Sequence, residues 1–167
     1  TPRSLSSAIG KSRLAASDRR DRTMTLFTIG FSGKSAESFF SSLGDAGVRR
    51  LLDIRLNPAG QLSGFAKARD LPFFLHALCR IEYHYVPTLA PPRFLLDSYR
   101  SKLIDWSEYE RVYLATLKER AAASSVNADL LEAGCLLCSE ESSRRCHRRL
   151  AAEFLANHFP ALRVQHL

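Results

Sequence analysis

The chain has 167 residues, of which 46% are hydrophobic, and it carries a formal net charge of +7. This length and apolar content are typical of one folded domain and exclude a disordered or fibrous chain. No apolar run approaches the roughly 20 residues of a membrane-spanning helix, so we expect no membrane partner. Because no secretory segment is visible, the four cysteines predict free thiols and a cytoplasmic location.

The positive charge is concentrated at the N-terminus. Residues 1–23 carry six Lys or Arg side chains against two Asp, which is more than half of the excess charge. We expect this segment to be a disordered tail or sequence upstream of a natural start at Met24; a transit-type presequence is the alternative. Residues 24–167 then form the domain, where a basic surface must come from local clustering.

Apolar runs alternate with segments of helical period after Met24, which predicts one α/β domain. Helix-sized crossovers between the apolar runs predict a mostly parallel sheet of about five strands, flanked by helices. In chain order we expect a strand over 25–31, a helix over 36–43, a strand over 50–56, a helix over 71–79, a strand over 82–86, a helix over 106–119, a strand over 135–139, a helix over 145–158 and a strand over 162–166.

Polar side chains follow the first two predicted strands, at the carboxyl ends where parallel sheets bind ligands. Ser32 and Lys34 follow the first strand, in a turn that ends like a P-loop but lacks the glycine spacing of that motif. Lys34 therefore lies either in a phosphate-binding turn or in an ordinary strand-to-helix turn. Asp53 and Arg55 are two residues apart and share a face of the second strand, so both an ion pair and a catalytic role are open.

The start of the last predicted helix has an unusual charge. Between residues 139 and 150 the chain carries four arginines, a cysteine and a histidine. Because the first turn of a helix exposes unpaired N–H groups and the positive end of its dipole, arginines there predict a bound phosphate or carboxylate. Arg148 and Arg149 are thus candidate phosphate-binding residues. In the alternative, the arginines point into water and pair with Glu140 and Glu141.

The same segment offers candidates for catalysis. If a serine caps the helix, Cys146 lies in its first turn, where a thiol pKa is lowered and the thiolate becomes a nucleophile. A small packed thiol is the alternative. His147 is then a candidate general acid or base, and Glu140 is either a base of raised pKa or a partner for Arg148.

Zinc is not expected from the cysteine spacing. Cys135 and Cys138 are an odd number of residues apart on a predicted strand and so point to opposite faces, while Cys146 and His147 are neighbours on a helix and diverge. The intervals also differ from those of zinc fingers. We therefore expect no metal and no other cofactor.

Several of these stretches resemble the domain-of-unknown-function 488 family (DUF488), and the resemblance extends over residues 25–167. It rests on residues 28–35, 53–57, 64–67, 89–91, 135–140 and 146–149, and on Trp106 with Tyr109. It implies a Rossmann-like α/β fold and an association with DNA repair. Phe31 stands where many members carry histidine, so no role is transferred to it. The motif positions transferred are Ser32, Asp53, Arg55, Lys67, Cys138, Glu140, Cys146, His147 and Arg148.

The leading hypothesis is an enzyme that processes nucleic acid or nucleotides. We expect DNA repair by N-glycosidic base removal, that is, a DNA glycosylase-like hydrolase with DNA or a nucleotide as partner. Asp53 or Glu140 would supply the carboxylate that activates water or stabilises a cationic sugar. The phosphate would be held by Lys34, Lys67, Arg148 and Arg149.

Two alternatives belong to other functional classes. One is a thiol-dependent enzyme that uses Cys146 with His147 on a small anionic substrate. The other is a non-catalytic module whose arginines bind a phosphorylated or acidic partner. A site at the carboxyl ends of the strands predicts convergence on one concave surface of Ser32, Asp53, Arg55, Glu140 and His147.

Overall fold

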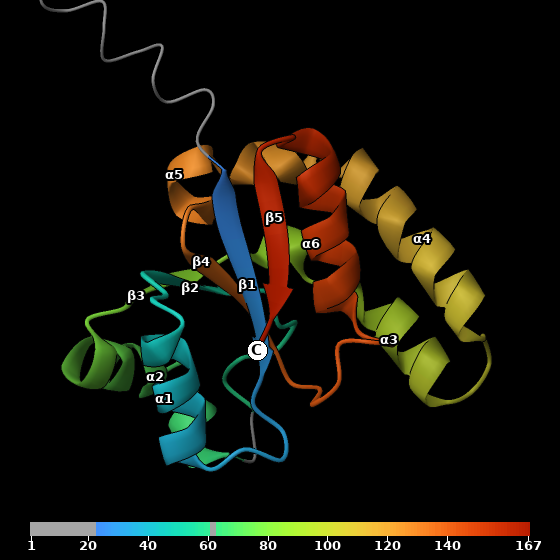
Figure 1. Cartoon of the computed structure of the whole chain (residues 1–167). Helices are drawn as coiled ribbons and strands as arrows, with labels where there is room; N and C mark the ends of the chain where they lie inside the picture. The colour runs from blue at the N-terminus through green and yellow to red at the C-terminus, as the bar shows by residue number, and fades with distance from the viewer. Residues whose placement is uncertain (1–22, 61–62) are drawn as a thin grey trace, which may run out of the picture.

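The computed structural model describes residues 23–60 and 63–167, and five parallel strands form its central sheet (Figure 1). The order across the sheet is β3-β2-β4-β1-β5. The α/β fold and the parallel five-stranded sheet predicted from sequence are confirmed. The predicted tail, apart from Thr23, lies outside the described residues. The strands are β1 (Met24–Gly30), β2 (Arg50–Asp53), β3 (Glu82–Tyr85), β4 (Gly134–Cys138) and β5 (Leu162–His166).

The helices cover both faces of this sheet. Within the described residues none is long and apolar enough to cross a membrane. The helix predicted over 106–119 has those bounds, and the one predicted over 71–79 is a short α-helix continued by a π-helical turn, Leu75–Cys79. Two helices, α3 and α5, were not predicted. The helices are α1 (Ala36–Asp45), α2 (Leu71–Phe74), α3 (Arg93–Arg100), α4 (Trp106–Glu119), α5 (Ala128–Leu131) and α6 (His147–His158).

Two separate hydrophobic cores lie on the two sides of the sheet. Consecutive strand residues alternate between them: Leu51 packs in the core under α1 and α2, whereas Leu52 packs in the core under α4 and α6. Figure 1 shows these two helix layers on opposite sides of the strands. Because both faces are covered, the inner strands β1 and β4 are largely apolar, which explains why they appear in the sequence as hydrophobic runs. The edge strands β3 and β5 carry more polar residues.

The chain segments that leave β1 and β4 run close together at the carboxyl edge of the sheet. Gly30 pairs with Cys138 at the end of the ladder, and the Ser32 N–H donates to the Ser139 carbonyl at 3.0 Å. A Cβ atom on Gly30 would lie 1.6 Å from the Glu140 carbonyl oxygen, so only glycine permits this approach. The fold thereby places the loops after β1 and β4 side by side at this edge of the sheet.

Candidate functional site

A cavity of about 550 Å³ opens at this edge of the sheet. Four of the five residues that we expected to converge line it, and Asp53 does not. Helix α3 contributes two further cations. The charged and polar side chains of the lining are Ser32, Arg55, Asn57, Ser63, Arg93, Asp97, Arg100, Ser139, Glu140 and His147.

Helix α6 starts at the wall of this cavity, and its N-cap residue is a cysteine. Cys146 is the N-cap residue, and its Sγ accepts a hydrogen bond from the Arg148 backbone N–H at 3.4 Å. A serine cap and a Cys146 inside the first turn were predicted, so the helix starts two residues later than expected. Cys138, at the end of β4, points to the same side, and the two Sγ atoms are 3.1 Å apart.

The Arg148 side chain is internal, with 1% of its surface exposed. Its Nη1 donates to Cys138 Sγ at 2.8 Å and to the Glu140 carbonyl, and its Nη2 donates to the Glu141 carbonyl at 2.9 Å. The guanidinium therefore binds the backbone of the loop after β4 and fixes that loop to α6. This arrangement differs from both sequence alternatives, since the arginine neither points into water nor meets a carboxylate.

Glu140 connects this buried cluster with the cavity. Its Oε2 lies 3.4 Å from Cys146 Sγ and 3.9 Å from His147 Nδ1, while 39% of its side chain is exposed. Burial raises the pKa of Glu140, but the positive charge of His147, together with hydrogen bonding within the cluster, outweighs it, so the pKa lies below its ordinary value. Glu140 is thus an ionised carboxylate, and the raised pKa considered from sequence was wrong.

The two thiols titrate differently. A hydrogen bond from Cys138 lowers the pKa of Cys146 to about 6, against the opposing effect of burial and with further help from His147. Burial raises the pKa of the Cys138 thiol well above its ordinary range. Cys138 therefore keeps its proton and donates a hydrogen bond to the Cys146 thiolate. Burial lowers the pKa of His147, but Cys146 and Glu140 outweigh this effect and raise it, so the imidazolium is favoured.

The His147 ring lines the cavity and is 6% exposed. Its Nε2 is buried and has no hydrogen-bond partner among the described residues. A buried polar atom without a partner costs about 1–3 kcal/mol. A ligand or water that reaches this nitrogen through the cavity would recover that energy.

Asp53 and Arg55 form a buried ion pair, as one of the two sequence alternatives stated. Asp53 Oδ1 accepts from Arg55 Nε at 2.8 Å, and Oδ2 accepts from Arg55 Nη2 at 2.5 Å and from the Tyr83 hydroxyl at 2.8 Å. Arg55 also donates to the Ala66 carbonyl at 2.7 Å and lies over the Phe31 ring. The carboxylate thus faces Arg55 and Tyr83, and the held guanidinium reaches the cavity.

The other predicted phosphate-binding residues lie elsewhere. Lys34 is half-buried in the turn before α1, and Lys67 is exposed at the end of the short turn Gly64–Ala66. Arg149 pairs with Glu153 at 2.9 Å and with Glu110 at 3.4 Å. None of these three described side chains lines the cavity.

Sequence reasoning missed Arg93 and Arg100, which lie on α3. Together with Leu96 and Asp97 they follow an i, i+3, i+4, i+7 pattern and line the cavity with one face of the helix. The signal in the sequence was that spacing after the proline pair at 91–92, since proline is tolerated where a helix begins.

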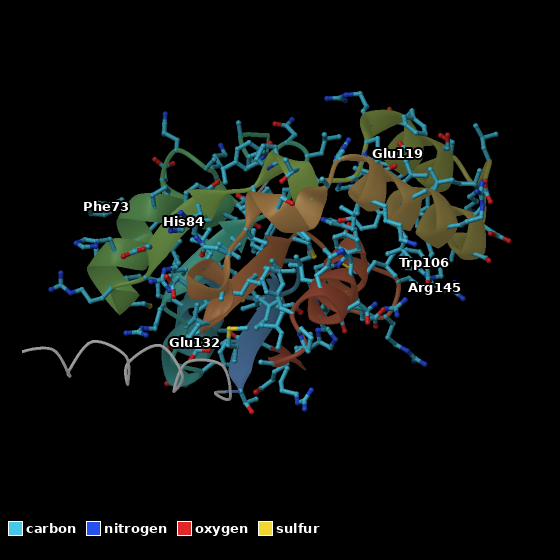
Figure 2. The ribbon with its side chains drawn as sticks, turned by 90° about the horizontal axis from the view of Figure 1, so that it is seen from above. Phe73, His84, Trp106, Glu119, Glu132 and Arg145 are labelled. Carbon is cyan, nitrogen blue, oxygen red and sulfur yellow. The ribbon has the colours of Figure 1, made fainter. Side chains whose placement is uncertain are left out.

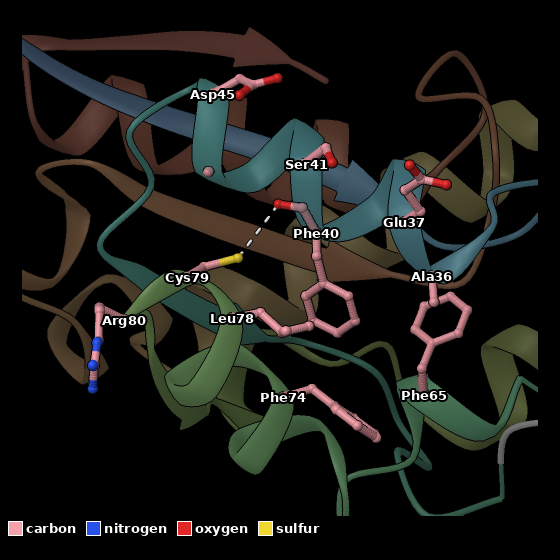
Figure 3. Close-up of a pocket in the computed structure, with 11 residues that line it drawn as sticks. Ala36, Glu37, Phe40, Ser41, Asp45, Phe65, Phe74, Leu78, Cys79 and Arg80 are labelled. Atoms are coloured by element: carbon pink, nitrogen blue, oxygen red, sulfur yellow. Dashed lines mark hydrogen bonds between the residues drawn. The ribbon is translucent and has the colours of Figure 1, made fainter.

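Two other hollows have a different chemistry. An apolar groove of about 670 Å³ between α1 and α2 is lined by Phe40, Phe65, Phe74 and Leu78, and its Cys79 thiol donates to the Phe40 carbonyl (Figure 3). A further hollow brings Trp106 and Arg145 together beside Glu140. Figure 2 shows Trp106 and Arg145 at the end of the molecule away from Phe73 and His84.

Comparisons with known proteins give one match. The family model described as "Domain of unknown function DUF488" matches residues 35–155, which is more than half of the chain. The matched range includes Asp53, Arg55, Glu140 and His147 and begins after Ser32. No curated protein and no solved structure matches.

Proposed function

We start from the fact that this chain belongs to the DUF488 family, and we propose that it is a hydrolase that removes a base from DNA or a nucleotide. The observation that carries this proposal is Glu140, a half-exposed, ionised carboxylate in the wall of a cavity that also contains three arginines. Cleavage of an N-glycosidic bond needs this combination, because positive charge develops on the sugar while the substrate carries phosphate.

The volume and the lining of the cavity suit a nucleotide-sized substrate that carries phosphate. Its volume of about 550 Å³ falls in the range of small-molecule sites. Arg93 and Arg100 present planar guanidinium groups that can bind phosphate oxygens in pairs. Phe31, Leu56 and Leu96 give the same lining an apolar part against which a base can pack.

We assign the reaction as follows. The C1′–N bond of the substrate breaks and its electron pair leaves with the base, while a water oxygen forms the new bond to C1′. Glu140 stabilises the cationic sugar and orients the water. His147, whose raised pKa favours its protonated form, supplies a proton to the departing base, and the water proton passes to the Glu140 carboxylate.

A thiol-dependent reaction on a small anionic substrate is the second candidate. It is favoured by the environment of the Cys146 Sγ, which accepts a hydrogen bond from the Arg148 backbone N–H and lies 3.4 Å from Glu140 Oε2. Cys146 is only 2% exposed and lies behind Glu140, so the carboxylate would have to move before the sulfur could attack. Access therefore favours Glu140 as the reacting group.

The test measures release of bases from oligonucleotides and nucleotides that carry damaged bases. We expect Glu140→Gln to reduce release by roughly 10²–10⁴-fold, the usual contribution of a positioned acid or base, while substrate binding persists. Glu141→Gln is the matched control, because Glu141 is exposed and outside the cavity lining. Cys146→Ser should reduce base release less than Glu140→Gln does, and only because loss of the thiolate lowers the pKa of His147.

Three results would contradict the proposal. Wild-type protein that binds substrate without releasing any base would indicate the non-catalytic phosphate-binding module. Loss of activity in Cys146→Ser with retention in Glu140→Gln would favour the thiol enzyme. Equal activity in Glu140→Gln and Glu141→Gln would remove Glu140 from the reaction.

A further inference from the structure

We propose that Cys138, Cys146 and Glu140 form a binding site for a thiophilic divalent cation such as Zn²⁺. One ligand atom from each residue, two sulfurs and a carboxylate oxygen, lies within 4.8 Å of the other two. This inference goes beyond the proposed function and does not depend on it, because metal binding is measured without substrate. It also replaces the expectation from sequence that the chain holds no metal.

The spacing of the three atoms is close to that of a tetrahedral zinc site. With Zn–S near 2.3 Å and Zn–O near 2.0–2.2 Å, ligand atoms in such a site lie about 3.5–3.8 Å apart. Cys146 Sγ and Glu140 Oε2 are 3.4 Å apart, and the two Sγ atoms are 3.1 Å apart. The two sulfurs would therefore have to move apart by roughly 0.7 Å to reach the tetrahedral spacing. The third pair, Cys138 Sγ and a Glu140 carboxylate oxygen, lies within 4.8 Å.

The two sulfurs of this site are not the pair Cys135 and Cys138 whose spacing predicts no zinc. Cys135 does point away from Cys138, since it packs in the core under α1 and α2. The partner of Cys138 is instead Cys146, eight residues later, which the loop after β4 returns to the start of α6. Glu140 lies within that loop, so the set spans only nine residues.

The surroundings of the sulfurs are those of metal-bound thiolates. Arg148 donates its Nη1 to Cys138 Sγ at 2.8 Å and its backbone N–H to Cys146 Sγ at 3.4 Å. Such outer donors orient metal ligands and stabilise their negative charge. Two thiolates and a carboxylate balance one divalent cation and the buried Arg148. A bound cation takes over the charge that favours the His147 imidazolium, so with neutral His147 the loaded cluster has no net charge, which offsets the cost of burying these charges.

Three protein ligands leave a fourth position for a ligand from outside. Closed structural zinc sites have four protein ligands, whereas sites that react with or bind a substrate keep one position open. Glu140 lines the cavity and Cys138 and Cys146 lie behind it. The fourth ligand would therefore be water or an anionic substrate group that enters through the cavity.

The experiment loads the full, reduced chain with Zn²⁺ or Co²⁺ and removes unbound metal by dialysis. We expect one zinc per chain by elemental analysis, and a cobalt–thiolate charge-transfer band of the intensity given by two sulfurs. Cys138→Ser and Cys146→Ser should each lower affinity by roughly 100-fold or more, since losing a ligand exceeds the 10–100-fold cost of losing an outer partner. Glu140→Gln should weaken binding and keep the two-thiolate band.

Cys79→Ser is the matched control, because this thiol lies in the separate groove between α1 and α2 and its loss should leave the band unchanged. The Glu140→Gln variant keeps the test valid if a cysteine variant fails to fold, as Glu140 is half-exposed. The proposal is overturned if wild-type protein retains no metal and shows no band. It is also overturned if the cysteine variants bind like Cys79→Ser, or if Cys138 and Cys146 are found as a disulfide that excludes metal in reducing buffer.

Discussion

Two buried charged clusters lie at the carboxyl ends of neighbouring strands, and they differ in how fully their polar atoms are bonded. Asp53, the last residue of β2, and Arg55, two residues later, are 0% and 2% exposed, and both oxygens of the Asp53 carboxylate accept hydrogen bonds. In the second cluster, by β4, Glu140 is half-exposed, Cys146 has a lowered pKa and His147 Nε2 lacks a partner among the described residues. The polar atoms of the first cluster are thus bonded as in a structural ion pair, whereas the second cluster keeps polar groups that a ligand could meet.

The largest effect on stability should come from breaking the buried Asp53–Arg55 ion pair. Asp53→Ala leaves the Arg55 charge buried without its partner, and we expect a loss of about 3–5 kcal/mol in the free energy of unfolding. Denaturant unfolding followed by circular dichroism measures it. Asp97→Ala, at an exposed carboxylate, should change stability by less than about 0.5 kcal/mol. If the two variants were equally stable, the Asp53–Arg55 ion pair would not stabilise the fold.

A smaller loss of stability should follow when the wall of the second cluster is displaced. Gly30→Ala places a Cβ 1.6 Å from the Glu140 carbonyl oxygen, so the loop after β4 must move. We expect about 1–3 kcal/mol of destabilisation, the usual cost of overpacking, together with loss of the cobalt–thiolate band. Gly64→Ala, where a Cβ meets nothing within 4 Å, is the control. An intact band in Gly30→Ala would show that the loop is not held by this contact.

The sequence predicted best those elements that local pattern determines. Trp106, Tyr109 and Tyr113 recur at helical spacing, and α4 has the predicted bounds. Because side chains alternate between the two faces of a strand, the sequence correctly predicted that Cys135 and Cys138 point to opposite faces of the sheet. Helix α3 was missed because it has only eight residues, in which Leu95 is buried and Leu96 and Tyr99 are partly buried, so its apolar stripe is short.

The contacts within the site could not be predicted in the same way. The 3.1 Å approach of Cys138 to Cys146 depends on how the loop between them returns to the sheet. The same holds for Arg148, whose burial depends on two carbonyl groups of that loop. Sequence identified the residue types of the site, and tertiary structure decided which of them meet.

The titration of Cys146 sharpens the comparison further. In reduced, metal-free protein the ultraviolet absorbance of the Cys146 thiolate, taken as the difference between wild type and Cys146→Ser, should rise with pH through a midpoint of about 6. Cys138→Ala removes the hydrogen bond that contributes most to this shift, so the midpoint should move upward, towards the ordinary value of 9.0. Each unit of movement corresponds to about 1.4 kcal/mol.

The same shift has a consequence for stability. A thiol whose pKa is lower in the folded state stabilises the fold above the unfolded value, and this contribution is lost as pH falls towards 6. Cys146→Ser should therefore flatten the pH dependence of unfolding between about 9 and 6. If the Cys146 thiol of the wild type titrated with a midpoint near 9, the hydrogen bond from Cys138 would not lower its pKa and the description of this cluster would be wrong.

The smallest effects concern single phosphate contacts, and they separate the cavity from the arginines at the start of α6. If DNA phosphate binds in the cavity, Arg93→Ala and Arg100→Ala should each weaken binding to all sequences alike and reduce the slope of log affinity against log salt by about one unit. Arg149→Ala should leave the slope unchanged, because Arg149 pairs with Glu110 and Glu153. Fluorescence anisotropy of a labelled oligonucleotide at several salt concentrations measures these slopes. All variants keep residues 1–23, so the charge of that segment contributes equally to each. The reverse pattern, with an effect only in Arg149→Ala, would move the phosphate from the cavity to the surface of α6.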